Sequence, residues 1–149
     1  MNTTTFVPSV PKSLGYAGLL PFLALSIGLW VIPQQYTHEV TQALLAYGAV
    51  ILSFMGAIHW GAAIDLVNKK QQKQLAWSVL PSLVAWLALL VPVIYGYFLL
   101  IIAFAMLCVL DSIASKQKIM PPWYPQLRIP LTTVVITCLV IALLAITVK

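Results

Sequence analysis

His59 is the residue of this chain best suited to chemistry, because it is a titratable side chain inside a long apolar run. The surrounding stretch, residues 53–61, reads Ser-Phe-Met-Gly-Ala-Ile-His-Trp-Gly. A polar group in such surroundings is costly unless it finds a hydrogen-bonding partner. Three roles are open: a hydrogen bond that fixes a neighbouring helix, a proton relay or ligand contact shared with Trp60, and metal ligation together with Met55, one helical turn away.

The sequence offers no further residues with which His59 could build a metal or cofactor site. His38 is 21 positions away, about 31 Å along one helix, so the two histidines cannot bind one haem iron. Cys108 and Cys138 lie inside apolar runs, where a thiol behaves as a small hydrophobic group. The sequence contains neither a phosphate-binding glycine loop nor a nucleophile elbow. We therefore predict no metal, no cofactor and no catalytic residue, and we expect that the protein is not an enzyme.

Asp65, Asp111 and Arg128 form a second polar group, at the expected ends of apolar runs. Asp111 and Arg128 flank a proline-aromatic segment, so their helices are expected to be antiparallel neighbours. The planar fork of arginine favours pairing with a carboxylate, which predicts a contact between Arg128 and Asp111 or Asp65. His59 is about 9 Å and about 120° away from Asp65 on one helix. We therefore expect two separate devices: His59 bonded inside the bundle, and an ion pair at the membrane edge contributing about 1 kcal/mol if solvated.

Small residues recur every four positions along the run that carries His59. Ala49, Ser53, Ala57 and Gly61 would form a ridge that is nearly bare backbone. Such ridges let membrane helices approach closely. We predict that these four residues form a helix-packing face, and that leucine at Gly61 would disrupt the folded bundle.

The composition is that of a membrane protein. Hydrophobic residues make up 62% of the 149 residues and charged residues 7%, with a mean hydropathy of +1.00. The apolar runs are about 20 residues long, which is the length of a helix that crosses a hydrocarbon core. Backbone groups in lipid must pair internally, so helices are expected. We predict one all-α membrane domain over residues 1–149, a compact five-helix transmembrane bundle with spans at about 13–32, 42–67, 75–91, 95–114 and 129–148.

The basic residues are distributed unevenly between the two sides of this predicted bundle. One side receives seven of them and the other side only Lys149; the seven are Lys12, Lys69, Lys70, Lys73, Lys116, Lys118 and Arg128. Cytoplasmic loops carry the excess of lysine and arginine, so the N-terminus is predicted inside and the C-terminus outside. The same rule and anionic lipid account for the net charge of +5, so we predict the lipid bilayer as a partner and no binding to nucleic acid.

Two stretches resemble the signatures of a small family of uncharacterised membrane proteins. They run from Tyr47 to Gly61, which includes the His-Trp-Gly motif, and from Trp123 to Thr132. The family is a bacterial domain of unknown function that includes the mitochondrial transmembrane protein sixty-nine. Met55 and Ala57 depart from the residues expected there, while the histidine is unaffected. The resemblance covers the whole chain and implies a multi-pass protein of the bacterial or mitochondrial inner membrane, without an established activity.

Three functions are therefore compared. The first is a non-enzymatic accessory or assembly factor that packs against other membrane subunits, which the small-residue ridge and the lack of deep carboxylates favour. The second is a small carrier or proton-conducting protein that uses His59, although the segment Leu44–Leu52 offers almost no polar group for a path. The third is a binder of a lipid-soluble or redox ligand in a pocket near His59 and Trp60.

Overall fold

The computed structural model describes residues 6–63 and 69–148, with side chains from residue 75 onward in the second stretch. Within these ranges the chain contains helices and no strand, as the composition predicts. In order, the elements are α1 (Ser9–Ala17), α2 (Leu20–Val31), the short 3-10 helix η1 (Gln34–Tyr36), α3 (Thr37–Ala63), α4 (Lys69–Leu90), α5 (Val93–Lys116) and α6 (Tyr124–Val148). The predicted all-α bundle is confirmed.

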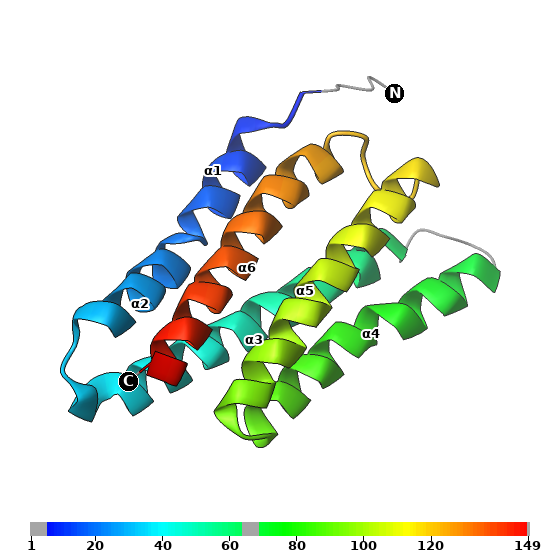
Figure 1. Ribbon diagram of the computed structural model, residues 1–149. Coiled ribbons are helices and arrows are strands. Elements are labelled where there is room, and N and C mark those ends of the chain that lie inside the picture. The colour runs from blue at the N-terminus through cyan, green and yellow to red at the C-terminus, as the bar shows by residue number, and fades with distance from the viewer. Residues whose placement is uncertain (1–5, 64–68, 149) are drawn as a thin grey trace.

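The first predicted span is interrupted, because Pro21 lies near the start of α2. A proline inside a helix lacks an N–H and clashes with the carbonyl four residues earlier, here that of Ala17. Ala17 is the last residue of α1, and the chain resumes its helix at Leu20. The helix is therefore broken just before Pro21, with α1 and α2 following one another along the bundle (Figure 1).

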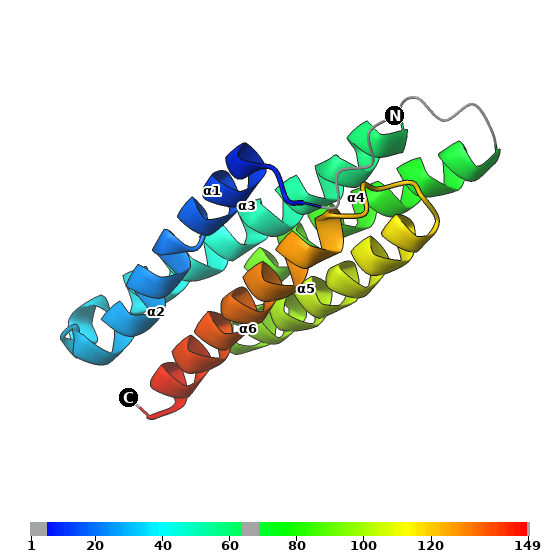
Figure 2. The ribbon, with the colours of Figure 1, turned by 90° about the horizontal axis from the view of Figure 1, so that it is seen from above.

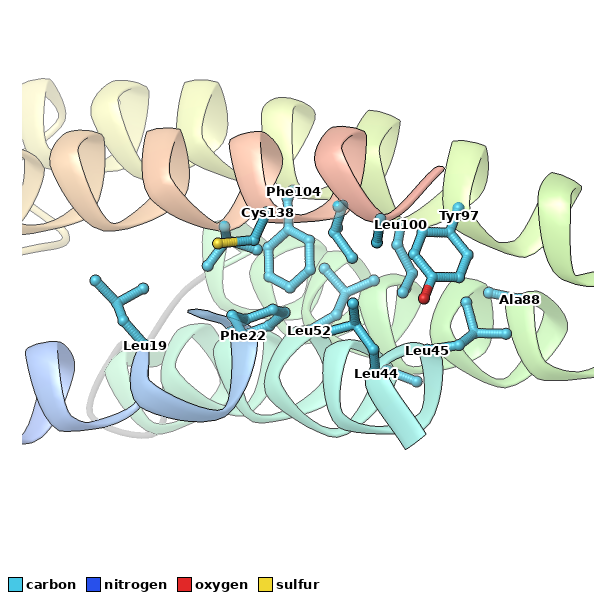
Figure 3. Packing of buried hydrophobic residues seen from close by; sticks show 14 of the residues in the cluster. Leu19, Phe22, Leu44, Leu45, Leu52, Ala88, Tyr97, Leu100, Phe104 and Cys138 are labelled. Atoms are coloured by element: carbon cyan, nitrogen blue, oxygen red, sulfur yellow. The ribbon is translucent and has the colours of Figure 1, made fainter. Parts of the chain in front are cut away.

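Helix α3 lies at the centre of the bundle and contacts α2, α4, α5 and α6. Figures 1 and 2 show α4 running antiparallel beside α3, while α2 and α6 lie side by side on the other flank. The main core fills the space between these helices. Phe22 lies edge-on to Phe104 at a ring distance of 6.3 Å (Figure 3). Tyr97 donates a hydrogen bond of 3.1 Å to the carbonyl oxygen of Thr41.

Helix α4 is held by two close backbone approaches. A Cβ atom added at Gly56 of α3 would lie 2.6 Å from the carbonyl oxygen of Ser78 on α4. A Cβ atom added at Gly96 of α5 would lie 2.5 Å from the carbonyl oxygen of Ala88 on α4. Only glycine lets the backbones meet at these points, so α4 is fixed against both of its neighbours by small residues.

The predicted packing ridge on α3 is wrong at two of its four residues, Ala57 and Gly61. Ala49 is buried and Ser53 half-buried, but Ala57 and Gly61 are exposed. A Cβ atom added at Gly61 would meet nothing within 4 Å. An α-helix has 3.6 residues per turn, so a line of residues spaced by four drifts about 40° per step, or about 120° from residue 49 to residue 61. The face that packs instead follows spacings of three and four and includes Gly48 and Gly56.

Among the described residues, four helical segments are long and apolar enough to cross a membrane: Ser9–Val31, Gln34–Ala63, Val93–Lys116 and Tyr124–Val148. The apolar part of α4, Leu75–Leu90, is shorter than these, about 24 Å at about 1.5 Å per residue. The five predicted spans thus correspond to four long segments and one short helix. The predicted helix bounds also move, because α4 begins at Lys69 and α6 at Tyr124.

The polar connections gather at one end of the bundle. The start of α1, the end of α3, the start of α4 and the connection between α5 and α6 all lie at this end (Figure 1). Helix α5 ends there, and Lys118 just beyond it has the left-handed backbone conformation, with a φ of 60°. This conformation lets the N–H of Ile119 donate a hydrogen bond to the carbonyl oxygen of Ala114. We call this the basic end, because Lys12, Lys69 and Lys116 belong to its helices.

Candidate functional site

Asp111 joins His59 and Arg128 into one buried cluster, which we call the triad. Its Oδ1 atom lies 2.6 Å from Nε2 of His59, and its Oδ2 atom accepts a hydrogen bond of 2.7 Å from Nε of Arg128. The exposed fractions are 5% for His59, 1% for Asp111 and 6% for Arg128. Both oxygens of one carboxylate are therefore engaged by side chains from α3 and α6.

The three residues meet because α3, α5 and α6 contact one another and each residue lies in the part of its helix toward the basic end. His59 is four residues before the last described residue of α3, Ala63. Asp111 is five residues before the end of α5, and Arg128 is four residues after the start of α6. The contacts of Asp111 with the other two side chains place all three residues at one level along the bundle.

The expectation of two separate devices is wrong, because His59 and the ion pair share one carboxylate. Arg128 pairs with Asp111, which is one of the two partners that the sequence predicted. Asp65, the other predicted partner, lies outside the described residues. The pair is also not a solvated one at the membrane edge, since both side chains are buried. Helix α6 begins before Arg128 rather than after it, because Pro121 and Pro122 precede the helix and Pro125 suits its first turn.

A small apolar cluster separates the triad from the basic end. Ala114 of α5, Met120 of the connection and Tyr124 of α6 form it, with Ile58 and Trp123 packed against them. Apolar cover excludes water and strengthens electrostatic interactions beneath it. Taking three polar side chains out of water is unfavourable, so each must be matched by its partners within the triad.

Three donors on α6 lack a partner among the described residues. They are the hydroxyl groups of Tyr124 and Thr132 and the Nη2 atom of Arg128, and all three atoms are buried. The residues are spaced by four, so they lie along one face of α6, about 6 Å apart. Sequence reasoning missed Tyr124 and Thr132, although their spacing from Arg128 is a signal that could have indicated them. Native structures leave few buried polar atoms unpaired, so this row needs an explanation.

The same three residues line a partly open cavity of about 440 Å³. Its other walls are apolar and come from α1, α2, α3 and α5, including Phe22, Ile51 and Phe104. Along α6 the lining extends from Trp123 to Val135, a length of about 18 Å. Ligand pockets are commonly lined by apolar side chains with a few polar groups, and their volumes are about 300–1,000 Å³.

His59 and Trp60 do not line this cavity. Trp60 is 47% exposed on the outside of the bundle, so the predicted pocket shared by His59 and Trp60 does not form. His59 instead borders a smaller cavity of about 120 Å³ with Trp77 and Leu107. Met55 lines the larger cavity. Within the described residues, no group of three or more His, Cys, Asp and Glu side chains is placed to hold a metal ion.

The fold and the triad define a helical membrane protein with a buried polar cluster and an apolar cavity beside it. The chain belongs to the family described as Protein of unknown function (DUF3429), whose model matches residues 7–144. It is 35% identical over 135 residues to Transmembrane protein 69 of Xenopus tropicalis, which covers 89% of this chain and 53% of that protein. It is 30% identical over 148 residues to Transmembrane protein 69 of Mus musculus, which covers 96% of this chain and 60% of that protein.

The chain therefore spans between half and two thirds of the length of the curated relatives it matches. No solved structure matches it. The family that the motifs around His59 and Arg128 resemble is thus confirmed, and both residues lie within the matched range.

Proposed function

We propose that this protein is a non-enzymatic binder of a lipid-soluble ligand in the bacterial or mitochondrial inner membrane. The observation that carries the proposal is the cavity of about 440 Å³, whose walls are apolar except at Tyr124, Arg128 and Thr132. A hydrocarbon ligand suits such walls, because almost all of the surface that faces the cavity is apolar. The triad would serve as the support that fixes Arg128 at the border of the cavity.

The positions of the polar groups support ligand binding over proton conduction. The triad lies near the basic end, whereas the core from Phe22 through Leu52 to Leu100 is apolar. A proton path from His59 to the opposite end would need polar groups or water along this stretch. The carrier alternative therefore receives no support from the described core.

The ligand can be sought by purifying the full chain in a mild nonionic detergent and analysing the extract by mass spectrometry. We expect a defined lipid-like molecule in near-stoichiometric amount. Ile51→Trp, which fills the cavity, should lose it, whereas Val50→Trp on the neighbouring exposed position should retain it. Equal recovery from both variants, or no defined molecule with the unmodified chain, would reject the proposal.

A second candidate is the accessory or assembly factor. It is favoured by the exposed surface of α3, where Ala57 and Gly61 leave open space beside the exposed side chains of Phe54 and Trp60. A small-residue surface of this kind allows another membrane helix to approach closely. The same purification separates the candidates, because this role requires one defined protein complex that Gly61→Leu disrupts and Ile51→Trp does not.

The topology that we propose has the basic end on the cytoplasmic or matrix side. The support is the position of the helix termini that carry Lys12, Lys69 and Lys116 at one end of the bundle, as the positive-inside rule requires. A fluorescent reporter fused after Lys118 should be active inside, and a periplasmic phosphatase fused at the C-terminus should be active outside. A phosphatase that is active at the connection between α5 and α6 would contradict this orientation.

A further inference from the structure

We propose that the cavity takes one hydrocarbon chain of a lipid from the surrounding bilayer, and that this chain enters sideways between α1 and α3. The inference rests on the proposed binding function and names the class of its ligand. The polar end of the lipid stays outside the cavity, so the protein recognises the chain rather than the headgroup.

The cavity wall gives a polar headgroup no partner. Almost all of the surface that faces the cavity is apolar. The unpaired polar atoms of Tyr124, Arg128 and Thr132 are themselves buried, so they do not open into the cavity. Arg128 also has the carboxylate of Asp111 as its counter-charge. A headgroup in the cavity would therefore give up its water without gaining hydrogen bonds, which is unfavourable, whereas a hydrocarbon chain has no such requirement.

The cavity opens to one side because the helix is broken before Pro21. Helix α2 packs against both α3 and α6, whereas the substantial packing of α1, in the described part of the chain, is against α6. At the break itself, Tyr47 of α3 donates a hydrogen bond of 2.9 Å to the carbonyl oxygen of Gly18. From the break toward the basic end, residues of α1 and α3 form opposite walls of the cavity, with α6 at its floor.

The rim of this opening is continuous with the lipid-facing surface of the bundle. Val10 and Leu14 of α1 and Phe54 of α3 line the cavity, and all three side chains are also exposed. Lipid tails are as apolar as these side chains. A chain can therefore pass from the bilayer into the cavity without crossing a polar layer.

The length of the cavity corresponds to one leaflet of a bilayer. Along α6 the lining extends from Trp123 to Val135, about 18 Å at about 1.5 Å per residue. The hydrocarbon core of a bilayer is about 30 Å thick, so each leaflet contributes about 15 Å. Trp123 lies just before α6, at the basic end. The cavity thus lies in the leaflet at the basic end and has the length of one of its chains.

The test uses a phosphatidylcholine that carries a photoreactive diazirine in the middle of one chain. The full protein is reconstituted in nanodiscs that contain this probe and illuminated, and the adducts are located by mass spectrometry of its peptides. Met55 lines the cavity, whereas Met106 is exposed on α5 outside the lining, so the two methionines form a matched pair. We expect adducts on both, because Met106 contacts the bilayer and Met55 contacts the bound chain.

Exchange distinguishes a bound chain from passing contact with the bilayer. Before illumination, the loaded nanodiscs are mixed with an excess of vesicles without probe. Adducts on Met106 should fall in proportion to the dilution, whereas adducts on Met55 should fall more slowly, because a bound lipid has a longer residence time. Ile51→Trp, which fills the cavity, should lower adducts on Met55 about 10-fold. The control Val50→Trp, at the neighbouring exposed position, should leave them unchanged.

A second set of probes tests which part of the lipid is recognised. The same diazirine chain on phosphatidylglycerol should label Met55 within about 2-fold of the phosphatidylcholine probe, because both headgroups stay outside. A phosphatidylcholine with the diazirine on its headgroup should label Met55 about 10-fold less than the chain probe. Labelling of Met55 that follows headgroup charge, or strong labelling by the headgroup probe, would overturn recognition of the chain.

The outcomes also separate this inference from the proposed function. If adducts on Met55 and Met106 fall together on dilution, while a defined molecule lost in Ile51→Trp is still extracted from the purified chain, the bilayer chain is overturned and the binding function stands. If they fall together and no defined molecule is extracted, both proposals are overturned.

Discussion

Asp111→Asn is expected to lower the free energy of unfolding by about 3–5 kcal/mol, because it leaves the buried guanidinium group of Arg128 without a counter-charge. Asparagine keeps the shape of the side chain but removes its charge. The same substitution weakens the contact with His59, since Oδ1 and Oδ2 serve different partners. The measurement is unfolding of the purified chain in detergent, followed by far-ultraviolet circular dichroism.

The matched control is Glu39→Gln, which makes the same chemical change at an exposed position in the first turn of α3. There the loss should stay within about 1 kcal/mol, the size of a favourable charge near a helix N-terminus. The double variant Asp111→Asn with Arg128→Gln should be more stable than Asp111→Asn alone, because no unpaired charge is buried. If Asp111→Asn and Glu39→Gln were equally mild, the triad would not stabilise the fold.

Gly56→Leu is expected to destabilise the bundle by about 3 kcal/mol, since overpacking a tight interface typically costs about 1–3 kcal/mol and the obstacle here is backbone. Its Cβ atom alone would lie 2.6 Å from the carbonyl oxygen of Ser78 and 3.1 Å from Cβ of Pro81. A backbone carbonyl cannot rotate away as a side chain can, so α4 would have to move as a whole. Thermal unfolding in detergent measures the effect.

The control for this prediction is Gly61→Leu on the same helix. Its Cβ atom would meet nothing within 4 Å, so leucine there should be tolerated in the isolated chain. Leucine also has a better helix propensity than glycine, which favours the variant by a fraction of a kcal/mol. Loss of the folded bundle in Gly61→Leu, with Gly56→Leu unaffected, would restore the ridge predicted from the sequence and contradict the observed helix face.

The glycine positions illustrate why local patterns identify a packing motif but not its location. The sequence correctly indicated that small residues let α3 approach its neighbours. It did not indicate which side of α3 faces α4, because that side is set by contacts with other helices. Gly56 and Ala57 are adjacent in sequence yet point about 100° apart, so a small error in the assumed repeat exchanges buried and exposed residues.

The triad illustrates the same limit for polar residues. Asp111 and Arg128 are separated by 17 positions across one connection, so their pairing could be predicted from two antiparallel neighbours. His59 and Asp111 are separated by 52 positions, and their contact requires that α3 and α5 be adjacent with both residues at one level.

The sequence by itself determined the class of this protein, because a long apolar run in lipid must satisfy its own backbone and therefore becomes a helix. It also determined the helix break before Pro21 and the concentration of lysine at one end, both of which are local properties. Only the tertiary structure decided three other features: the contacts that join His59, Asp111 and Arg128, the close approach of two glycines to α4, and the cavity beside Thr132. These features depend on the rotation and depth of each helix relative to its neighbours, and packing between helices sets those two quantities only when the whole bundle forms.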